Sequence, residues 1–421
     1  MARLLVLRGM AGPRPEFFAP FVSTVADVVT IVSPSGPRGE REVATLRQFG
    51  EVVVADPGQP LVDLALSSAH RHRVDGVVTF SEATLETAAD VAERLGLPGH
   101  SPASVRLMQN KHDQRVALRD AGVAVPPFTT VRAEADLTSA LDQVPLPAVF
   151  KPVYGAGSFL TVRVDAADDL RRAFARAMDQ YAAHPLFRSR PPDFVLEGLL
   201  TGGGEWHADQ RWGDYVSVES VVHGGAPVHY TVTDKLPLAT GFIETGDLAP
   251  SVLPADRQDE VTKVVTQALQ AVGARDGLTH VEVKLTADGP RVLEVNGRVG
   301  GPLDYLVSAA SDLSLVREAA KVALGRAPQP RADFIRHALY ATPAAPERPA
   351  RLRQIHGLEA ARAITGVREL LPAQEPGAIL DRYNGPSMLY GLLVAAPTRE
   401  QVCQIAQRVH ETLAFDTEEV D

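Results

Sequence analysis

The stretch His280–Gly301 reads HVEVKLTADGPRVLEVNGRVGG, and its alternation of apolar and polar residues predicts two β-strands joined by a turn. If a five-residue loop over 286–290 joins the strands, Glu282 lies directly opposite Glu294. Like charges at facing positions are unfavourable, so a cation held between the two carboxylates best explains the arrangement. The amide of Asn296 lies one step further along the same face. Oxygen ligands of this kind suit Mg²⁺, which takes its remaining oxygens from phosphates and water.

The plainer alternative for these acidic residues is an ordinary hairpin face exposed to solvent. Arg298 and the glycine pair Gly300–Gly301 follow the second strand at once and make this alternative less attractive. The sequence therefore predicts a nucleotide–metal site at this hairpin.

Size and composition restrict the class of protein. The chain has 421 residues, 45% of them hydrophobic and 22% charged, which predicts a folded protein of about two to four domains. No apolar run approaches the roughly 20 residues that span a bilayer, and MARLLVLRGM at the N-terminus is expected to form a strand and not a signal peptide. The formal net charge of −10 argues against non-specific binding to nucleic acid or membrane. A single cysteine, Cys403, excludes an internal disulfide, and a cytoplasmic location is expected.

Lysine is rare in this chain, because only six of the 42 basic residues are lysines. A lysine is a compact charge on a flexible stem and is suited to reaching a phosphate. Lys111 begins a predicted helix behind the capping residue Asn110, where a positive charge is unfavourable unless an anion is near. Lys151 ends an apolar strand and precedes the turn Gly155–Ser158, whose backbone N–H groups can approach phosphate oxygens. Solvated lysines are the alternative at both positions.

The first hundred residues alternate short apolar runs with helical patterns, which predicts a parallel sheet with crossover helices. The apolar runs are 4–7, 28–32, 52–54 and 76–79, and a helical pattern covers 85–97. The segment RGMAGPRP after the first run lacks G-x-G-x-x-G, so we do not expect this part to bind a dinucleotide.

The remaining chain mixes both kinds of pattern. Helices are predicted at 107–121, 166–181, 256–272, 303–324 and 399–413. Strands are predicted at 148–152, 194–196, 205–210, 214–222, 228–233, 378–381 and 389–395. Residues 341–351 are rich in proline and alanine and are interpreted as a linker or an edge loop.

The segment Val195–Leu200 is an apolar run that contains Glu197, and the flexible turn Thr201–Gly204 leads from it to Glu205. Such a strand and turn can offer backbone groups to a base and a carboxylate to ribose hydroxyls. An edge strand with a loop is the plainer alternative.

Taken together, these motifs resemble the ATP-grasp superfamily of carboxylate–amine ligases. Five of them keep the order of that superfamily between Asn110 and Gly301: the lysine helix, the lysine–glycine loop, E-x-x-L, the acidic hairpin and N-x-R-x-G-G. The tail is similar to the C-terminal domain of L-amino acid ligases. The resemblance implies a multidomain α/β (α+β) chain: an N-terminal Rossmann-like α/β domain (1–108), an ATP-grasp fold (109–326) with a mobile lid at about 127–201, and a small C-terminal α+β domain (327–421).

The resemblance also implies a role for each matching position around ATP. The groups expected to hold the phosphates are Lys111, Lys151, Gly155, Gly157 and Ser158. The groups expected to hold adenine and ribose are Glu197, Leu200 and Glu205, the first two mainly through their backbones.

The metal ligands that the resemblance implies are Glu282, Glu294 and Asn296, which would bind Mg²⁺, with Mn²⁺ as an alternative ion. Arg298 would stabilise an acyl phosphate and a tetrahedral intermediate, and we expect Arg298 and Lys151 to be the catalytic residues.

The segment 235–251, KLPLATGFIETGDLAPS, matches the part of L-amino acid ligases that contacts the first amino acid. Glu244 would pair with the α-ammonium, and the predicted substrate contacts are Glu244, Asp247, Arg298 and Gly301. The chain departs from some members at Asp247, where a histidine can occur, at Pro302, where an aromatic residue can occur, and at Gly297, where proline is commoner. The additional acid suggests a larger or basic first substrate, and a solvated loop is the alternative.

The expected reaction joins the carboxylate of an amino acid to an amine, most simply a second amino acid, through an acyl phosphate, with release of ADP and phosphate. The expected partners are small molecules, with no nucleic acid and no membrane, and a homodimer is compatible with the sequence. The alternatives are an ATP-grasp carboxylase, a ligase for a nucleotide precursor, and a nucleotide-binding regulator without catalysis.

Overall fold

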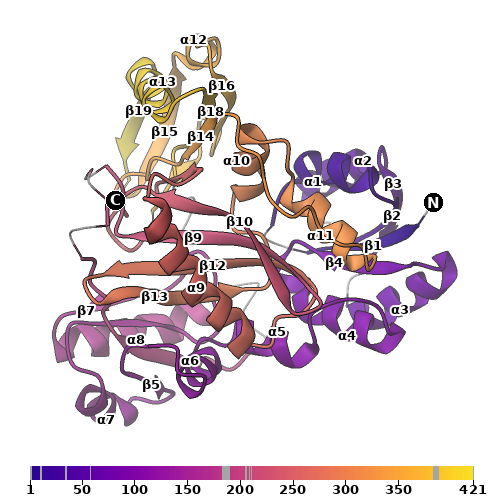
Figure 1. Cartoon of the computed structure of the whole chain (residues 1–421). Coiled ribbons are helices and arrows are strands. Elements are labelled where there is room, and N and C mark those ends of the chain that lie inside the picture. Colours follow the sequence, from indigo (N-terminus) through magenta and orange to yellow (C-terminus); the bar gives the residue numbers. More distant parts are fainter. Residues whose placement is uncertain are drawn as a thin grey trace.

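The computed structural model describes residues 2–9, 12–33, 36–56, 58–182, 190–203, 206–207, 209, 211–382 and 388–420. Figure 1 shows an antiparallel sheet at the centre of the molecule, with the N-terminal segment at one end of it and the C-terminal segment at the other. Among the helices that the structure describes, none combines the length and the apolar character needed to cross a membrane.

The N-terminal segment is a parallel sheet with strand order β3-β2-β1-β4, as the alternating pattern predicts. Its strands are β1 (Arg3–Arg8), β2 (Asp27–Val32), β3 (Gly50–Val54) and β4 (Gly76–Thr79). Its helices are α1 (Pro15–Ser23), α2 (Gly36–Leu46), α3 (Leu61–His72) and α4 (Leu85–Leu95), with the short 3₁₀ turn η1 (Glu82–Thr84). The helices α5 (Pro102–Gln109) and α6 (Lys111–Asp120) then lead towards the central sheet.

A smaller antiparallel sheet with order β5-β8-β6-β7 follows, and we call it the lid sheet. Its elements are β5 (Phe128–Val131), α7 (Asp136–Gln143), β6 (Ala148–Pro152), β7 (Val162–Val164), α8 (Ala167–Tyr181) and β8 (Phe194–Gly198). Phe150 stacks on Phe194, and Phe174 meets both rings edge-on, so the lid sheet and α8 share an apolar core of their own.

The central sheet has eight strands in the order β13-β12-β9-β10-β11-β14-β18-β16. Its strands are β9 (Tyr215–His223), β10 (Ala226–Lys235), β11 (Gly246–Ala249), β12 (Gly277–Thr286), β13 (Gly289–Asn296), β14 (His337–Ala341), β16 (Val367–Pro372) and β18 (Tyr390–Ala396). Strands of the C-terminal segment therefore extend the same sheet that contains the acidic hairpin. The three-stranded sheet β17-β15-β19 completes the chain, and its elements are β15 (Ala350–His356), β17 (Ile379–Leu380) and β19 (Ala414–Glu419).

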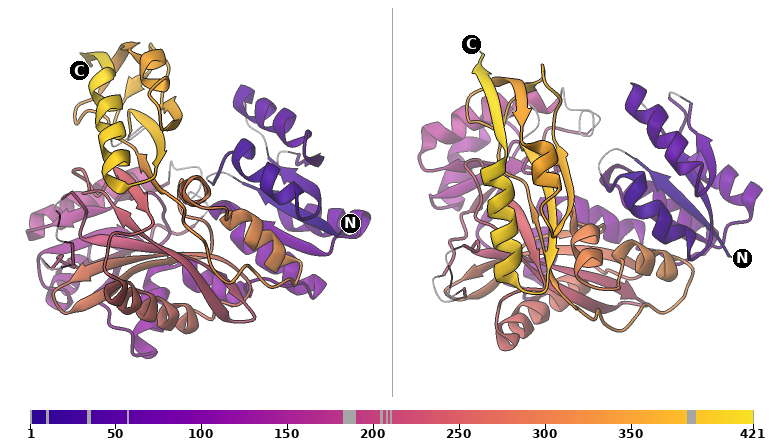
Figure 2. Two further views of the ribbon diagram at one scale, coloured as in Figure 1. Left: turned by 45° about the horizontal axis from the view of Figure 1, so that its top comes forward. Right: turned by 90° about the horizontal axis from the view of Figure 1, so that it is seen from above.

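The two faces of the central sheet differ in character. One face is apolar and packs beneath α9 (Ala255–Ala271) and α13 (Arg399–Thr412), which Figure 2 shows from two further directions. The other face packs at one end on α10 (Leu303–Ala310), α11 (Leu315–Ala323) and the N-terminal segment. Its remaining part consists of paired polar side chains, among them His280, Glu282, Ser217, Glu219, Lys235 and Asp247. Buried polar side chains in adjacent rows make this part of the face the candidate for the functional site.

Two long predicted helices are each two helices in the structure. The expected helix 107–121 breaks at Asn110, whose backbone is extended and whose side chain accepts a hydrogen bond from the Asp113 N–H. The expected helix 303–324 breaks at 311–314, because Ser314 caps α11 in the same way. A local side-chain cap competes with continuation of the helix. The prediction of continuous helices was therefore wrong at both positions, whereas the expectation that Asn110 caps a helix beginning at Lys111 is confirmed.

Several short elements were not predicted, and one predicted strand is absent from the described residues. The missed elements are β5, α7, β7, β11, β14, β15, α12 (Leu358–Arg362), β16 and β19. The strand expected at 205–210 lies partly outside the described residues, and those of its residues that are described form no strand. The linker expected at 341–351 contains the end of β14 and the start of β15.

The acidic hairpin reaches the predicted register by an unpredicted route. The turn has only two residues, because Thr286 pairs with Gly289, so the five-residue loop was wrong. The strand pairing then changes register between Glu282 and Val283, where a β-bulge adds one residue to β13. This additional residue restores the register that the sequence predicts. Glu282 therefore lies opposite Glu294, as the sequence predicts.

Gln114 of α6 fastens this helix to the hairpin. Its side-chain amide donates to the Val295 carbonyl and accepts from the Val295 N–H, both at 2.9 Å, and it is 1% exposed. This pair of bonds fixes Lys111, one turn earlier on α6, next to the metal-ligand candidates of β13.

Replacing Gln114 with methionine leaves two buried backbone groups without partners, at a cost of about 1–3 kcal/mol each. We expect the Gln114→Met variant to lose about 2–4 kcal/mol of unfolding free energy, measured by urea denaturation. The control is Gln407→Met on the exposed side of α13, which we expect to stay within about 0.5 kcal/mol of the native value. Equal losses of unfolding free energy in both variants would contradict a stabilising role for the two Gln114–Val295 hydrogen bonds, which we call the Gln114 clamp.

Candidate active site

Each of the two facing carboxylates, Glu282 and Glu294, contacts a positively charged side chain of the protein. Lys111 Nζ lies 2.9 Å from Glu294 Oε1, and His280 Nε2 lies 3.3 Å from Glu282 Oε1. The other ring nitrogen of His280 lies 2.8 Å from Glu219 Oε1. Burial lowers the pKa of His280, but the Glu219 and Glu282 carboxylates outweigh it and raise this pKa to about 9. His280 is therefore an imidazolium at neutral pH, and it offsets part of the repulsion between the two acids.

The same contacts prepare the carboxylates to bind a cation. Burial raises the pKa of Glu282, but the hydrogen bond and charge of His280 outweigh it, so this pKa lies below its ordinary value. Both contacts involve Oε1 of the carboxylate, so Oε2 of Glu282 and of Glu294 is left for a ligand among the residues that the structure describes. Within the described ranges, no three His, Cys, Asp or Glu side chains form a preformed metal cluster. Two carboxylates and the Asn296 amide still suit Mg²⁺, which normally takes only one or two carboxylates from a protein in nucleotide sites.

Lys111 also connects the hairpin to the lid sheet. Its ammonium donates to the Gly155 carbonyl at 2.7 Å, and the residue is 8% exposed. The helix start, the glycine loop and Glu294 thus meet at one buried ammonium group. This geometry brings together three of the residues that the sequence singles out.

Lys151 and Glu197 form a second buried charge group together with Arg115, which the sequence analysis missed. Glu197 Oε2 lies 3.0 Å from Lys151 Nζ and 3.2 Å from Arg115 Nη2. Burial raises the pKa of Glu197, but the two cations outweigh it and lower this pKa to about 2. Burial likewise holds the pKa of Lys151 below its ordinary value. Arg115 follows Lys111 by four residues and shares its helix face, and this spacing is the signal that could have identified it.

The glycine loop touches the segment expected to bind the substrate. Ser158 Oγ donates to the Phe242 carbonyl at 2.8 Å. Among described non-glycine residues with positive φ, Ser158 (57°), Leu160 (54°) and Phe242 (59°) cluster at this contact, and Arg73 lies elsewhere. Strained backbone of this kind concentrates at ligand clamps. The contact gives the lid sheet a direct connection to the substrate segment.

Arg298 is oriented by a residue of the N-terminal segment. Its Nε lies 2.7 Å from Glu82 Oε2, and Gln109 donates to the other oxygen of Glu82 at 2.7 Å. Glu82 belongs to the stretch SEAT after β4 and carried no role in the sequence analysis. Gly300, two residues after Arg298, has no room for a side chain, because an added Cβ would lie 2.6 Å from His280 Nδ1. An added Cβ at Gly301 would meet nothing within 4 Å. The local packing therefore requires glycine at position 300 but not at position 301.

Two of the four expected substrate contacts, Glu244 and Asp247, lie at Lys235. Its ammonium lies 2.7 Å from Asp247 Oδ1 and 3.1 Å from Glu244 Oε1. Asp247 is buried, whereas the Glu244 side chain is 45% exposed. Leu200 lies just beyond β8 and is partly exposed. Glu205, the expected ribose ligand, lies outside the described residues.

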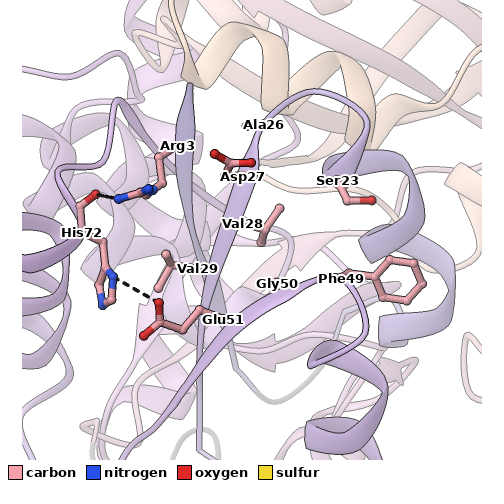
Figure 3. Close-up of a pocket in the computed structure, with 10 residues that line it drawn as sticks. All are labelled: Arg3, Ser23, Ala26, Asp27, Val28, Val29, Phe49, Gly50, Glu51 and His72. Carbon is pink, nitrogen blue, oxygen red and sulfur yellow. Dashed lines mark hydrogen bonds and ion pairs between the residues drawn. The ribbon is translucent and has the colours of Figure 1, made fainter. Parts of the chain in front are cut away.

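A cavity of about 320 Å³ lies away from all of these residues, at the amino ends of β1, β2 and β3 (Figure 3). Arg3, Asp27, Glu51 and His72 line it, and His72 is paired with Glu51. Ligands of open α/β sheets bind at the carboxyl ends of the strands. We therefore do not assign the cavity to the candidate active site.

Three family models match the chain. The model of the ATP-grasp N-terminal domain covers 27–99, that of the ATP-grasp domain covers 144–304, and that of the L-amino acid ligase C-terminal domain 2 covers 344–418. The chain belongs to the ATP-grasp superfamily. The matched ranges lie within the expected domains 1–108, 109–326 and 327–421, whose boundaries stay a prediction.

This ATP-grasp protein is similar to two curated proteins over part of their lengths. It is 26% identical to alanine–anticapsin ligase of Bacillus subtilis (strain 168), over 58% of this chain and 52% of the ligase. It is 30% identical to carnosine synthase 1 of Homo sapiens, over 54% of this chain and 28% of the synthase. The chain thus spans about half the length of the first relative and less of the second.

A solved structure has the same fold as this ATP-grasp protein. The crystal structure of an L-amino acid ligase from Bacillus licheniformis aligns with a TM-score of 0.82 at 21% identity, and the alignment covers 100% of this chain and 99% of the ligase. The predicted multidomain ATP-grasp fold is therefore confirmed.

The pKa of Glu197 predicts a pH dependence of stability. Because this pKa is depressed from 4.5 to about 2, the stabilising contribution is complete above pH 4.5 and disappears as the pH falls towards 2. We expect the native protein to lose about 2 kcal/mol more unfolding free energy between pH 6 and pH 3 than Glu197→Gln loses. Urea denaturation at each pH measures the difference, and the exposed Glu359→Gln serves as control. A native-like pH slope in Glu197→Gln would contradict the assigned charge group.

Proposed function

We propose that the protein is an ATP-dependent ligase that joins the carboxylate of an amino acid to an amine and releases ADP and phosphate. The observation that supports the proposal most is the contact of Lys111 with Glu294 of the facing acidic pair, close enough to Lys151 and Arg298 for the charge of Glu294 to act on both. The family models and the two named relatives support the ligase class and favour a second amino acid as the amine.

The nucleotide would lie between the lid sheet and the central sheet. Lys111 and Lys151 would hold the phosphates, and the loop Gly155–Ser158 would close over them. Glu197 and Leu200 would offer backbone groups to adenine, because the Glu197 carboxylate is already paired with Arg115 and Lys151. Phosphoryl transfer depends mainly on positioning and on neutralising oxygen charge, which this set of cations can provide.

Glu282, Glu294 and Asn296 would hold Mg²⁺, or Mn²⁺ in its place. When bound, the ion would neutralise charge on the β- and γ-phosphates.

The reacting carboxylate would lie near Arg298. In the proposed sequence a carboxylate oxygen attacks the γ-phosphorus, ADP leaves, and the amine then displaces phosphate from the acyl phosphate. The Arg298 guanidinium would stabilise the negative charge in both steps, and Glu82 would keep it aimed at the reacting atoms. Glu244, the exposed acid of the substrate segment, would bind the α-ammonium.

The test is a screen of amino-acid pairs with ATP and Mg²⁺ for ADP release, with the product mass recorded. We expect a pair-dependent release of ADP and a product of condensation mass, without a need for bicarbonate. The Glu294→Gln variant should lower kcat by about 10²–10³-fold, because the carboxylate charge that binds the cation is lost. The matched control Glu359→Gln should retain the native rate.

Release of ADP only with bicarbonate would favour a carboxylase. Nucleotide binding without turnover on any pair would favour a regulator. Native activity of the Glu294→Gln variant would contradict the assignment of Glu294 as a metal ligand.

A further inference from the structure

The group Lys235–Glu244–Asp247 contains two acids and one cation, and Lys235 and Asp247 are buried. Lys235 ends β10 and is 2% exposed, and it lies directly across from Asp247 in the β10–β11 ladder. Its ammonium contacts both acids, at 2.7 Å for Asp247 and 3.1 Å for Glu244. No second cation lies within 4.0 Å of either acid among the residues that the structure describes.

We infer that Lys235 is a specificity-determining residue, which neutralises Asp247 and excludes amino acids with a positively charged side chain from the Glu244 subsite. The inference rests on the proposed function. It replaces the suggestion, made from the additional acid, that the first substrate is basic.

The surroundings keep the lysine in place. The Tyr215 ring lies 5.9 Å from the ammonium, and the buried Tyr215 hydroxyl has no hydrogen-bond partner among the described residues. Asp247 pairs with Tyr340 on its other side in the ladder, so an aromatic residue flanks each end of this ion pair. A buried charge without its partner is costly, so Lys235 and Asp247 hold each other in a fixed position.

The charges set what the subsite can accept. One cation and two anions leave a net charge of −1, which a single α-ammonium neutralises. Glu244 is the member of the group that reaches solvent, because its side chain is 45% exposed, compared with 6% for Asp247 and 2% for Lys235. A second positive charge on the substrate would face the Lys235 ammonium and find no free acid. An uncharged side chain avoids this repulsion.

The experiment compares three first substrates at a fixed second substrate. They are L-ornithine, L-lysine and the amino acid with an uncharged side chain that releases ADP fastest in the pair screen. The native enzyme should have a kcat/KM at least about tenfold higher for the uncharged amino acid. Lys235→Met frees both acids and should shift the ratio by about tenfold or more towards the diamino acids. The double variant Lys235→Met, Asp247→Asn has a net charge of −1 again and should restore the native preference.

A further variant tests the inference if Lys235→Met does not fold. Asp247→Asn leaves one cation and one anion, so the KM for the amino acid should rise about tenfold while the KM for ATP stays unchanged. A native preference for diamino acids, or an unchanged ratio in Lys235→Met, would overturn the inference while the ligase activity stands. Absence of ADP release with every amino acid would instead remove the proposed function.

Discussion

Two carboxylates held opposite each other on adjacent strands are the constraint on which this structure depends. The ladder between β12 and β13 places Glu282 and Glu294 face to face, and a backbone register cannot relax as a flexible side chain can. Lys111 and His280 reduce the resulting repulsion from two different elements. The position of α6, the approach of the lid sheet and the burial of His280 follow from this need for positive charge.

The same rule extends to the lid sheet and along the polar face of the central sheet. Glu197 is matched by Lys151 and Arg115, Glu219 by His280, and Asp247 by Lys235. Buried ion pairs add little net stability, but the loss of one partner is costly. A face built in this way is rigid and prepared for an anionic ligand with its cation, and the Gln114 clamp and the Glu82–Arg298 contact fix its edges.

Sequence patterns predicted what depends on local periodicity. The parallel N-terminal sheet and β6 follow from alternation and hydrophobic runs. The opposition of Glu282 to Glu294 was expected from a five-residue loop, but a two-residue turn and a β-bulge produce it. The cap at Ser314 was harder to anticipate than the cap at Asn110, because a polar residue within a helical pattern is also compatible with a continuous helix. The short strands β11, β14 and β16 lack a periodic signal, and they form because neighbouring strands of the central sheet pair with them.

The partners of the predicted site residues differ in how readily the sequence could have identified them. Arg115 and His280 lie close in sequence to Lys111 and Glu282, so spacing could have identified them. Glu82 meets Arg298 across 216 residues, and only the folded chain brings them together. Lys235 lies in the substrate segment, but its neutralising contact with Asp247 depends on the strand register.

The most direct test of the central claim is a crystal structure with Mg²⁺ and a non-hydrolysable ATP analogue. We expect the ion to be bound by an oxygen of Glu282 and an oxygen of Glu294 at about 2.0–2.1 Å, with phosphate oxygens completing its shell. An ion held only by phosphates and water, with both carboxylates still in contact with Lys111 and His280 alone, would contradict the account.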